Sequence, residues 1–243
     1  PYVRGREKSR PIEDIVSEAE RYVAAGVKEI TLLGQNVNSY GRDLYGSPRF
    51  TQILKALDET GVERLRFATS HPKDLSDEVI AQFGTLRSLM PALHLPAQSG
   101  SDRILQLMNR RYTSAHYRQL VSKLRDACPD IALSTDIIVG FPGETEKDFM
   151  DTARLVDEIG YHQVFTFIYS KREGTPAASM EDNTPHDVIQ KRFDRLVDIV
   201  QAHAFEKNQL DLGATIPVLV EGSSKRDELL IAGKSPKNQT VHA

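Results

Sequence analysis

The fold of this chain is decided by the stretch Ser134-Thr135-Asp136-Ile137-Ile138-Val139-Gly140-Phe141-Pro142-Gly143-Glu144-Thr145. Its central residues, Ile137 to Val139, are consecutive and apolar, which indicates a strand covered on both faces, as in a parallel sheet. The two glycines that follow permit a tight turn, and Thr145 to Asp148 resembles a capping box that opens a helix. In α/β proteins this combination often binds a cofactor, although an ordinary strand-to-helix turn has the same pattern.

The same order of strand, polar loop and helix recurs on both sides of that stretch. Further strands are predicted at Val27–Leu33, Leu65–Thr69, Ala92–Leu95 and Gln163–Tyr169. Helices are predicted between them, and a long final helix is predicted to be capped by Thr184 to Asp187. This alternation predicts successive βαβ units and a parallel sheet. Because polar residues follow every strand, an open or partial barrel is favoured over a doubly wound sheet, which concentrates them at one point.

The sequence changes in character beyond Gly213. Ile216–Gly222 and Leu229–Ala232 are separated by charged residues and predict a β-hairpin. A hairpin of this size is not stable alone. It therefore belongs either to a truncated small β domain or to an edge packed on the barrel.

Composition limits the class of protein. The 243 residues, 40% of them hydrophobic, suffice for one large α/β domain or for one domain and a small module. The sequence has no apolar run of membrane-spanning length and no signal-peptide pattern, so we expect a cytoplasmic protein without a membrane partner. A net charge of -3 does not favour nucleic-acid binding by the whole chain, and any RNA contact must come from local basic patches.

Cysteine usage excludes two kinds of site. Cys128 is the only cysteine, so an internal disulfide is excluded, and one thiolate cannot anchor a metal cluster. The sequence starts at Pro1 rather than at a methionine, and we expect it to be a piece of something longer.

Five motifs in register resemble those of the radical-SAM methylthiotransferases. In chain order they are Pro1-Tyr2-Val3-Arg4-Gly5-Arg6-Glu7, Leu32-Leu33-Gly34-Gln35-Asn36-Val37-Asn38, Thr69-Ser70-His71-Pro72-Lys73, Leu93-His94-Leu95-Pro96-Ala97-Gln98-Ser99-Gly100-Ser101 and Val139-Gly140-Phe141-Pro142-Gly143-Glu144-Thr145. The likeness covers essentially the whole chain and is greatest to the members that modify tRNA. These add a methylthio group to C2 of isopentenylated adenosine beside the anticodon.

The resemblance implies a fold and a domain organisation. It implies an α/β fold, a partial (β/α) barrel of the radical-SAM type followed by the start of a small all-β TRAM domain. Residues 1–208 would be the radical-SAM core without its first strand and cluster loop, and residues 209–243 the N-terminal part of the TRAM domain.

The resemblance also implies two cofactors, S-adenosylmethionine (SAM) and a [4Fe–4S] cluster. The family's Cys-x3-Cys-x2-Cys motif is not in this sequence, so the cluster cysteines are expected upstream of Pro1 and the chain alone is expected to be inactive. In the parent enzyme SAM is cleaved reductively, and the resulting radical abstracts hydrogen from the adenine ring. The implied partners are tRNA, SAM and an electron donor, and a monomer is expected.

The resemblance assigns roles to residues of the polar loops. Gly34, Gln35 and Asn36 would lie near the SAM amino and carboxylate groups, and Gln98 and Ser99 near its sugar. The adenine would lie near Gly140, Phe141, Pro142, Gly143 and Glu144, and Ser70 would also contribute to the cofactor site. Glycines that allow close approach and amides that orient a polar ligand agree with these roles.

Other residues are candidates for contacts with the RNA substrate. Arg4, Arg6 and Arg10 belong to a cationic N-terminal segment and are candidates for tRNA phosphate contacts, while a solvated terminal arm is the plain alternative. Asn38 and Tyr40 are also expected near the substrate. His94 is expected to be a hydrogen-bonded residue of its strand, and neither it nor His71 shows metal-ligand spacing.

Two alternatives stay open. One is a methylthiotransferase for another tRNA adenosine modification or for a ribosomal protein, against which the Gln98-Ser99-Gly100-Ser101 run and the Gly34 to Asn38 loop argue. The other is a non-catalytic RNA-binding relative, in which the absence of cluster cysteines is real. Ala97 and Glu173 depart from the family pattern, which affects packing and loop shape more than chemistry.

Overall fold

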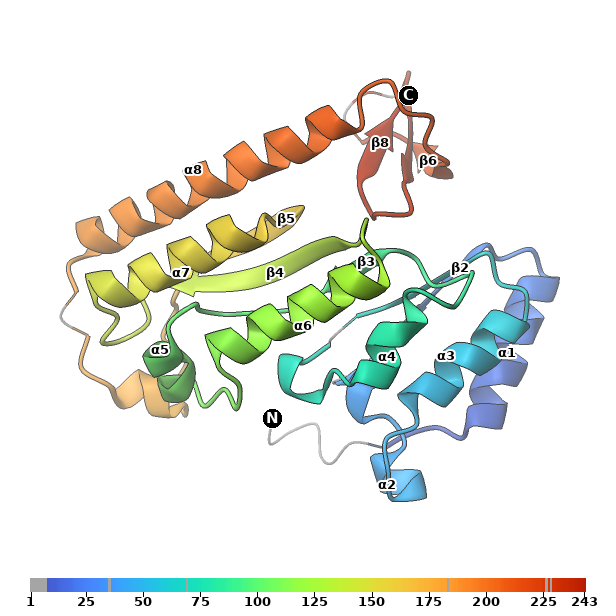
Figure 1. The fold of residues 1–243 in the computed structure, drawn as a ribbon, viewed down its shortest axis with the longest axis horizontal. Helices are drawn as coiled ribbons and strands as arrows, with labels where there is room; N and C mark the ends of the chain where they lie inside the picture. Colours follow the sequence, from blue (N-terminus) through green and yellow to red (C-terminus); the bar gives the residue numbers. More distant parts are fainter. Residues whose placement is uncertain (1–7, 35, 69, 183, 226, 228) are drawn as a thin grey trace. The chain divides into compact units, whose positions relative to one another are not determined.

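The computed structural model describes residues 8–243, apart from residues 35, 69, 183, 226 and 228 (Figure 1). These residues form two compact units, each with its own parallel strands. The first unit contains the described residues up to Leu93 together with Lys123–Ala132 and Thr215–Ala243. The second contains His94–Ser122 and Leu133–Ala214.

The first unit is built around a two-stranded parallel sheet. Its elements in chain order are α1 (Ile12–Ala24), β1 (Glu29–Leu32), η1 (Val37–Ser39), α2 (Arg42–Tyr45), α3 (Phe50–Glu59), β2 (Arg64–Phe67), η2 (Pro72–Asp74) and α4 (Asp77–Gln82). Glu29 pairs with Arg64 and Leu32 with Phe67. Helix α3 packs beside both α1 and α4 and buries Ile53, Leu54 and Leu57.

The second unit contains the strand and glycine turn of residues 134–145. The strands β3 (Ala92–His94), of which only His94 is assigned to this unit, β4 (Ala132–Val139) and β5 (Gln163–Ile168) form a sheet in that order, and β4 and β5 are parallel. The helices are α5 (Asp102–Leu107), α6 (Ser114–Ala127), α7 (Glu146–Ile159) and α8 (His186–Leu210), with a short η3 (Pro176–Ser179). Helices α7 and α8 lie side by side, and α8 also contacts β5 (Figure 1).

The core of the second unit is closed by polar as well as apolar contacts. Phe149, Leu155 and Val156 of α7 are buried, as are Thr135, Ile137 and Val139 on alternate positions of β4. Tyr117 of α6 is fully buried and donates its hydroxyl to the carbonyl of Leu95 at 2.6 Å. Burial raises the pKa of this tyrosine well above its ordinary value, so it remains a donor.

A three-stranded antiparallel sheet at the C-terminus belongs to the first unit. Its strands are β6 (Leu219–Ser223), β7 (Ile231–Lys234) and β8 (Thr240–His242). Two arginines of β2 hold it through its backbone: Arg64 donates to the carbonyls of Lys234 and Pro217, and Arg66 to those of Ser235 and Pro236. Arg66 is only 8% exposed and also donates to Glu29 of β1 at 3.0 Å.

The parallel α/β organisation predicted from the sequence is confirmed, and the capping box of Thr145 and Asp148 is present. The cap expected for the final helix was wrong in detail, because Pro185 is the N-cap and no side chain caps the helix. Ile189, Arg192 and Leu196 of this helix are buried, and Phe193 is half-buried. The hairpin expected near the C-terminus has a third strand, β8. None of the helices in the described residues has the length and apolar character needed to cross a membrane.

Candidate functional site

The loop after β1 presents two asparagine amides that are each half satisfied. Asn36 donates from Nδ2 to Oδ2 of Asp74 at 2.7 Å, whereas its Oδ1 is buried and has no hydrogen-bond partner among the described residues. Asn38 accepts from the Ser70 hydroxyl at 3.0 Å, whereas its Nδ2 is likewise buried and unpartnered in the described part of the chain. Since buried polar atoms almost always have partners, a free acceptor and a free donor in one loop indicate a polar ligand.

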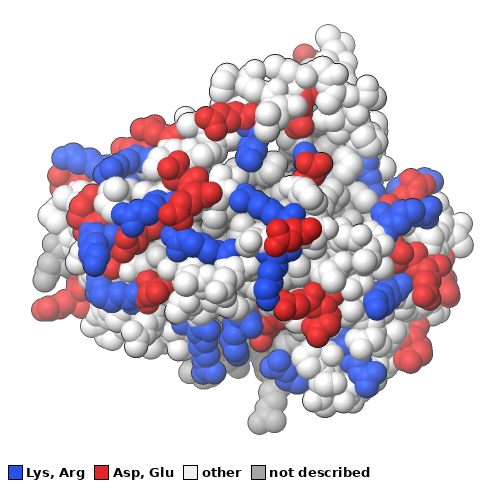
Figure 2. Space-filling view, in the orientation of Figure 1, with Lys and Arg blue, Asp and Glu red and all other residues white. Residues whose placement is uncertain are grey.

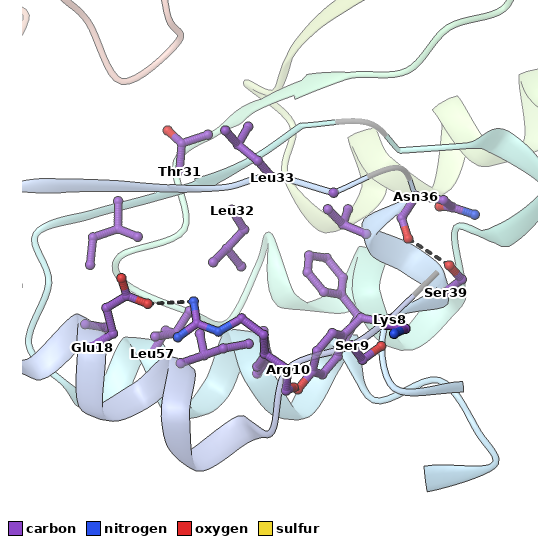
Figure 3. A pocket seen from close by; sticks show the side chains of 18 of the residues that line it. Lys8, Ser9, Arg10, Glu18, Thr31, Leu32, Leu33, Asn36, Ser39 and Leu57 are labelled. Atoms are coloured by element: carbon purple, nitrogen blue, oxygen red, sulfur yellow. Dashed lines mark hydrogen bonds and ion pairs between the residues drawn. The ribbon is translucent and has the colours of Figure 1, made fainter. Parts of the chain in front are cut away.

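A cavity of about 840 Å³ lies beside this loop in the first unit (Figure 3). Four predicted site residues line it: Arg10, Gly34, Asn36 and Tyr40. Apolar side chains of α1, β1 and α3 line it, together with polar and charged ones such as Ser9, Arg10 and Glu18. A mainly apolar lining with a few polar groups is the usual composition of a small-molecule site.

The cationic N-terminal segment is largely outside the described residues. Arg4 and Arg6 lie there, as does Gln35 of the loop after β1. Arg10 is described, and its guanidinium is paired with Glu18 of α1 at 2.6 Å (Figure 3). The Tyr40 hydroxyl donates to the Arg10 carbonyl at 2.5 Å, and burial, followed by the neighbouring Tyr45, raises the pKa of Tyr40 well above its ordinary value. The sequence did not reveal that Arg10 already has an acidic partner.

The loop after β3 is held in an unusual backbone conformation at Gln98. Its φ of 67° lies in the left-handed region, which residues other than glycine adopt only at a cost in free energy. In this conformation the Gln98 N–H donates to the carbonyl of Asp136 at 2.8 Å, and its own carbonyl accepts from Ile138 at 3.0 Å. Strained backbone conformations that are held in place by surrounding hydrogen bonds occur often at functional positions.

The remainder of that loop is fixed to α7. The Ser99 hydroxyl lies 3.1 Å from that of Thr152 and accepts from the Ser101 N–H at 3.1 Å. The Gly100 N–H donates to the Thr152 hydroxyl at 2.9 Å. Ser99 is 1% exposed. Its hydroxyl therefore holds the loop in place through internal partners.

The loop after β4 turns sharply through two glycines. Gly140 and Gly143 have φ values of 72° and 79°, and a Cβ at Gly140 would lie 2.6 Å from Ile189 of α8. Phe141 and Pro142 are buried, and the Phe141 ring meets Tyr169 edge to face at 5.2 Å between centroids. The Tyr169 hydroxyl is buried and has no hydrogen-bond partner among the described residues. A third unpartnered polar atom thus lies next to a predicted cofactor loop.

Glu144 ends this turn and is 4% exposed. Its carboxylate accepts from the Gly140 N–H at 3.3 Å and from Arg192 of α8 at 3.1 Å, and Arg192 also donates to Glu146 at 3.0 Å. Burial raises the pKa of Glu144 to about 7, against the opposing effects of the Gly140 N–H and Arg192. The glutamate thus braces the glycine turn against α8.

Asp148 connects the two loops of the second unit. It accepts hydrogen bonds from Ser101 at 2.6 Å and from the Thr145 hydroxyl at 2.5 Å, and it pairs with Arg103. Although burial opposes ionisation, the hydrogen bonds from Arg103, Ser101 and Thr145 hold the pKa of Asp148 well below its ordinary range. The sequence identified Asp148 only as part of a helix cap and missed Arg103 and Arg192. The partners of both arginines lie many residues away along the chain, so no local pattern reveals these contacts.

The structure thus brings the described site residues together in two groups, one in each unit. Gly34, Asn36, Asn38, Tyr40 and Ser70 belong to the first unit. The second contains Gln98, Ser99, Gly140, Phe141, Pro142, Gly143 and Glu144. His94 is hydrogen-bonded to Ser134 at 3.0 Å and lies 3.4 Å from Asp136, as expected for a residue of its strand. The described residues contain no group of three or more side chains arranged to hold a metal ion.

Comparison with known proteins found a matching family model and curated relatives. A family model described as the Radical SAM superfamily matches residues 1–156. The tRNA-2-methylthio-N(6)-dimethylallyladenosine synthase of Clostridium botulinum strain Langeland is 52% identical over 243 residues, which are 100% of this chain and 54% of the relative. The protein of the same name from Caldicellulosiruptor saccharolyticus is 52% identical over the same 243 residues, 51% of its length. This chain therefore spans about half the length of these curated relatives.

A solved structure supports the fold independently. The radical S-adenosylmethionine methyltransferase from Kitasatospora setae, with cobalamin and a [4Fe-4S] cluster bound, aligns with a TM-score of 0.55 at 14% identity. The alignment covers 70% of this chain and 33% of that one. The parallel α/β fold, the polar loops at the strand ends and the family match lead to one conclusion: this chain belongs to the radical SAM superfamily.

Proposed function

We propose that this chain forms the SAM- and substrate-binding part of a tRNA methylthiotransferase, which transfers a methylthio group to C2 of isopentenylated adenosine next to the anticodon. The identity of 52% to two synthases named for that product supports the choice of substrate, because it extends over all 243 residues. The enzyme acts in the cytoplasm as a monomer, with an electron donor as its further partner.

The observation that carries this proposal is the pair of unpartnered amide atoms after β1. Asn36 Oδ1 offers a buried acceptor and Asn38 Nδ2 a buried donor. The methionyl end of SAM carries an ammonium and a carboxylate, so it offers the complementary donor and acceptor. The chain's residues therefore fit this cofactor. Asp74 holds the Asn36 amide through its nitrogen, and Ser70 holds the Asn38 amide through its oxygen.

The loops after β3 and β4, in the second unit, are the other loops that we propose to contact SAM. Gln98 and the turn from Gly140 to Gly143 approach the sugar and the adenine of SAM through their backbones. A Cβ at Gly143 would meet open space, whereas the missing Cβ of Gly140 makes room for Ile189 of α8. Ser99 and Glu144 act as positioning residues, because their polar atoms are used to hold these loops on α7 and α8. The Tyr169 hydroxyl remains available as a donor next to Phe141.

The [4Fe–4S] cluster does not fit the residues of this chain. Such clusters are held by several cysteine thiolates, and the chain has one cysteine. SAM and the cluster supply the radical chemistry when both are bound, and we infer that three cysteines encoded before Pro1 provide the cluster ligands. The present chain binds and orients SAM and the substrate.

The substrate contacts and domains follow from the same proposal. Arg4, Arg6 and Arg10 contact tRNA phosphates, and Arg10 must exchange its Glu18 partner to do so. Residues 1–208 form a partial (β/α) barrel, and residues 209–243 begin an all-β TRAM domain, of which β6, β7 and β8 are the first strands.

The test uses the full-length protein, reconstituted anaerobically and supplied with tRNA from a strain that lacks the modification. Nucleoside mass spectrometry should detect the methylthio group on dimethylallyladenosine. Asn36→Ala and Asn38→Ala should each weaken SAM binding by about tenfold, the order expected for one hydrogen bond to a charged group. Asn208→Ala, which alters an exposed asparagine of α8, is the control. Unmodified tRNA, or SAM affinity unchanged in both variants, would refute the proposal.

A further inference from the structure

The sheet of the second unit has one covered face and one open face. Thr135, Ile137 and Val139 of β4 are at most 1% exposed and define the covered face. The intervening residues of β4 and their partners on β5 form the other face. In the parallel register Asp136 lies opposite Phe165, and Ile138 lies opposite Phe167.

Two phenylalanine rings are exposed on that second face. Phe165 and Phe167 are 42% and 51% exposed, although each lies within a strand. Complete burial of a large apolar side chain contributes about 1.5–3 kcal/mol, so a side chain left half in water forgoes about half of that. A pair of such rings on one strand therefore indicates a surface that is used for contact.

A polar cluster adjoins one of the rings. His94 of β3 meets Phe165 edge to face, with 5.8 Å between ring centroids. Its two ring nitrogens lie 3.0 Å from the Ser134 hydroxyl and 3.4 Å from the Asp136 carboxylate. His94 and Asp136 each retain 29% side-chain exposure, so the cluster can also reach a ligand. The face is thus polar at the level of Phe165 and apolar at the level of Ile138 and Phe167.

The spacing of the rings fits a planar aromatic ligand. Side chains on the same face of a strand recur every two residues, about 7 Å apart. Interacting aromatic rings have their centroids about 4.5–7 Å apart, so one planar ring can contact both side chains. Stacking on aromatic side chains is the usual way in which proteins hold a base taken out of RNA.

We propose that Phe165 and Phe167 form the platform that holds the substrate's purine base, with its polar edge toward His94 and Asp136 and its alkyl substituent over Ile138. This inference rests on the proposed function, which supplies an alkylated adenosine in RNA as the occupant. A purine has an apolar face and a hydrogen-bonding edge, and the alkyl group requires an apolar neighbour. The open face presents these features in the same order along the strands.

The test uses the reconstituted full-length enzyme and two anticodon stem-loop RNAs, with and without the dimethylallyl group. Phe165→Ala and Phe167→Ala should each raise KM for the dimethylallylated RNA by about five- to a hundredfold. The affinity for SAM and the Tm should stay near those of the wild type, because both rings are exposed. Phe167→Tyr should restore KM, since it retains the ring, whereas Phe167→Leu should not. Phe205→Ala is the matched control, since Phe205 is a 64% exposed phenylalanine of α8.

The outcomes separate the platform from the proposed function. If the wild type modifies the dimethylallylated RNA but both alanine variants keep KM within twofold, the platform is refuted and the function stands. If the wild type modifies neither RNA, the proposed function fails. If Phe167→Leu restores KM as fully as Phe167→Tyr, the side chain acts only by its volume, which also refutes stacking.

Discussion

Asp148 shows how one side chain can fix two loops that are far apart in the sequence. Its carboxylate receives Ser101 from the loop after β3 and Thr145 from the loop after β4. Arg103 adds an ion pair from α5. Since hydrogen bonds to an ionised group are about twice as strong as neutral ones, this cluster holds the loops in a single arrangement. The proposed cofactor site of the second unit is therefore preorganised.

Gly100 is the position at which this arrangement tolerates least change. A Cβ there would lie 2.4 Å from the carbonyl oxygen of Asp151 and 2.6 Å from Cα of Thr152, both in the backbone of α7. Gly100→Ala should therefore lower the free energy of unfolding by about 1–3 kcal/mol, because the helix backbone cannot move aside. Urea unfolding measures the effect. Gly34→Ala is the control, since its Cβ would meet the flexible Val37 side chain at 3.4 Å. Equal stability of the two variants would contradict the expectation.

Glu144 makes stability depend on pH between about 4.5 and 7. Its pKa is raised to about 7 by burial, so the folded state binds a proton more tightly than the unfolded state, where the pKa is near 4.3. Its stabilising contribution is therefore present at low pH and is lost as the pH rises through this range. As the pH rises through this range, the free energy of unfolding of Glu144→Gln should increase relative to that of the wild type by on the order of 3 kcal/mol.

The measurement is the free energy of unfolding at several pH values from 4.5 to 8. Glu146→Gln is the matched control, because Glu146 binds the same arginine but its side chain is 59% exposed. The control should follow the wild-type curve. Parallel curves for wild type and Glu144→Gln would show that burial of Glu144 does not govern this dependence.

At the scale of single elements, local patterns predicted the strands and helices well. The apolar run at Ile137 and the capping box at Thr145 are local signals: the run forms the predicted strand, and the box begins the predicted helix. The sequence could not predict where Arg192 or Arg66 would be buried, because each is satisfied by partners many residues away. A charged residue in a helical pattern indicates a solvated face unless such a partner is known.

The contact between β2 and the C-terminal sheet could not be predicted from the sequence for the same reason. Arg66 joins Glu29, Ser235 and Pro236, and only the first lies in a neighbouring strand of the parallel sheet. Period-two patterns specify which face of a strand is apolar, and they carry no information about a distant carbonyl. The hairpin after Gly213 was therefore predicted without its anchor.

Removing that anchor should loosen the C-terminal sheet selectively. Arg66→Met leaves two backbone carbonyls and the Glu29 carboxylate without their donor, at a cost of about 1–3 kcal/mol for each group that stays buried. Amide hydrogen exchange should become faster in residues 215–243 and change little in α7 and α8. Lys28→Met is the control, because its pair with Glu63 is exposed on both sides. Unchanged protection of residues 215–243 would show that Arg66 is dispensable.

At the scale of the whole chain, charge and chemistry are distributed differently. Acidic and basic side chains lie intermixed over the face shown in Figure 2, in agreement with the net charge of -3. The site residues, in contrast, follow the strands of both units. Composition alone therefore predicted little about RNA, whereas the ordered set of loop motifs predicted the family, which the comparisons confirm.

The last prediction is that the 243-residue chain binds SAM but does not bind an iron–sulfur cluster. Incubation of the 243-residue chain with iron and sulfide should not yield a stable [4Fe–4S] cluster, because Cys128 is its only thiol and burial raises the pKa of that thiol. Iron content and the cluster's visible absorbance measure this. SAM binding, followed by calorimetry, should remain detectable because the Asn36 and Asn38 amides belong to the chain. Cys128→Ala is the control and should give the same iron content. If iron is bound in stoichiometric amounts and is lost in Cys128→Ala, a cluster ligand lies inside this chain. That result would refute the proposal that the cluster ligands lie outside it.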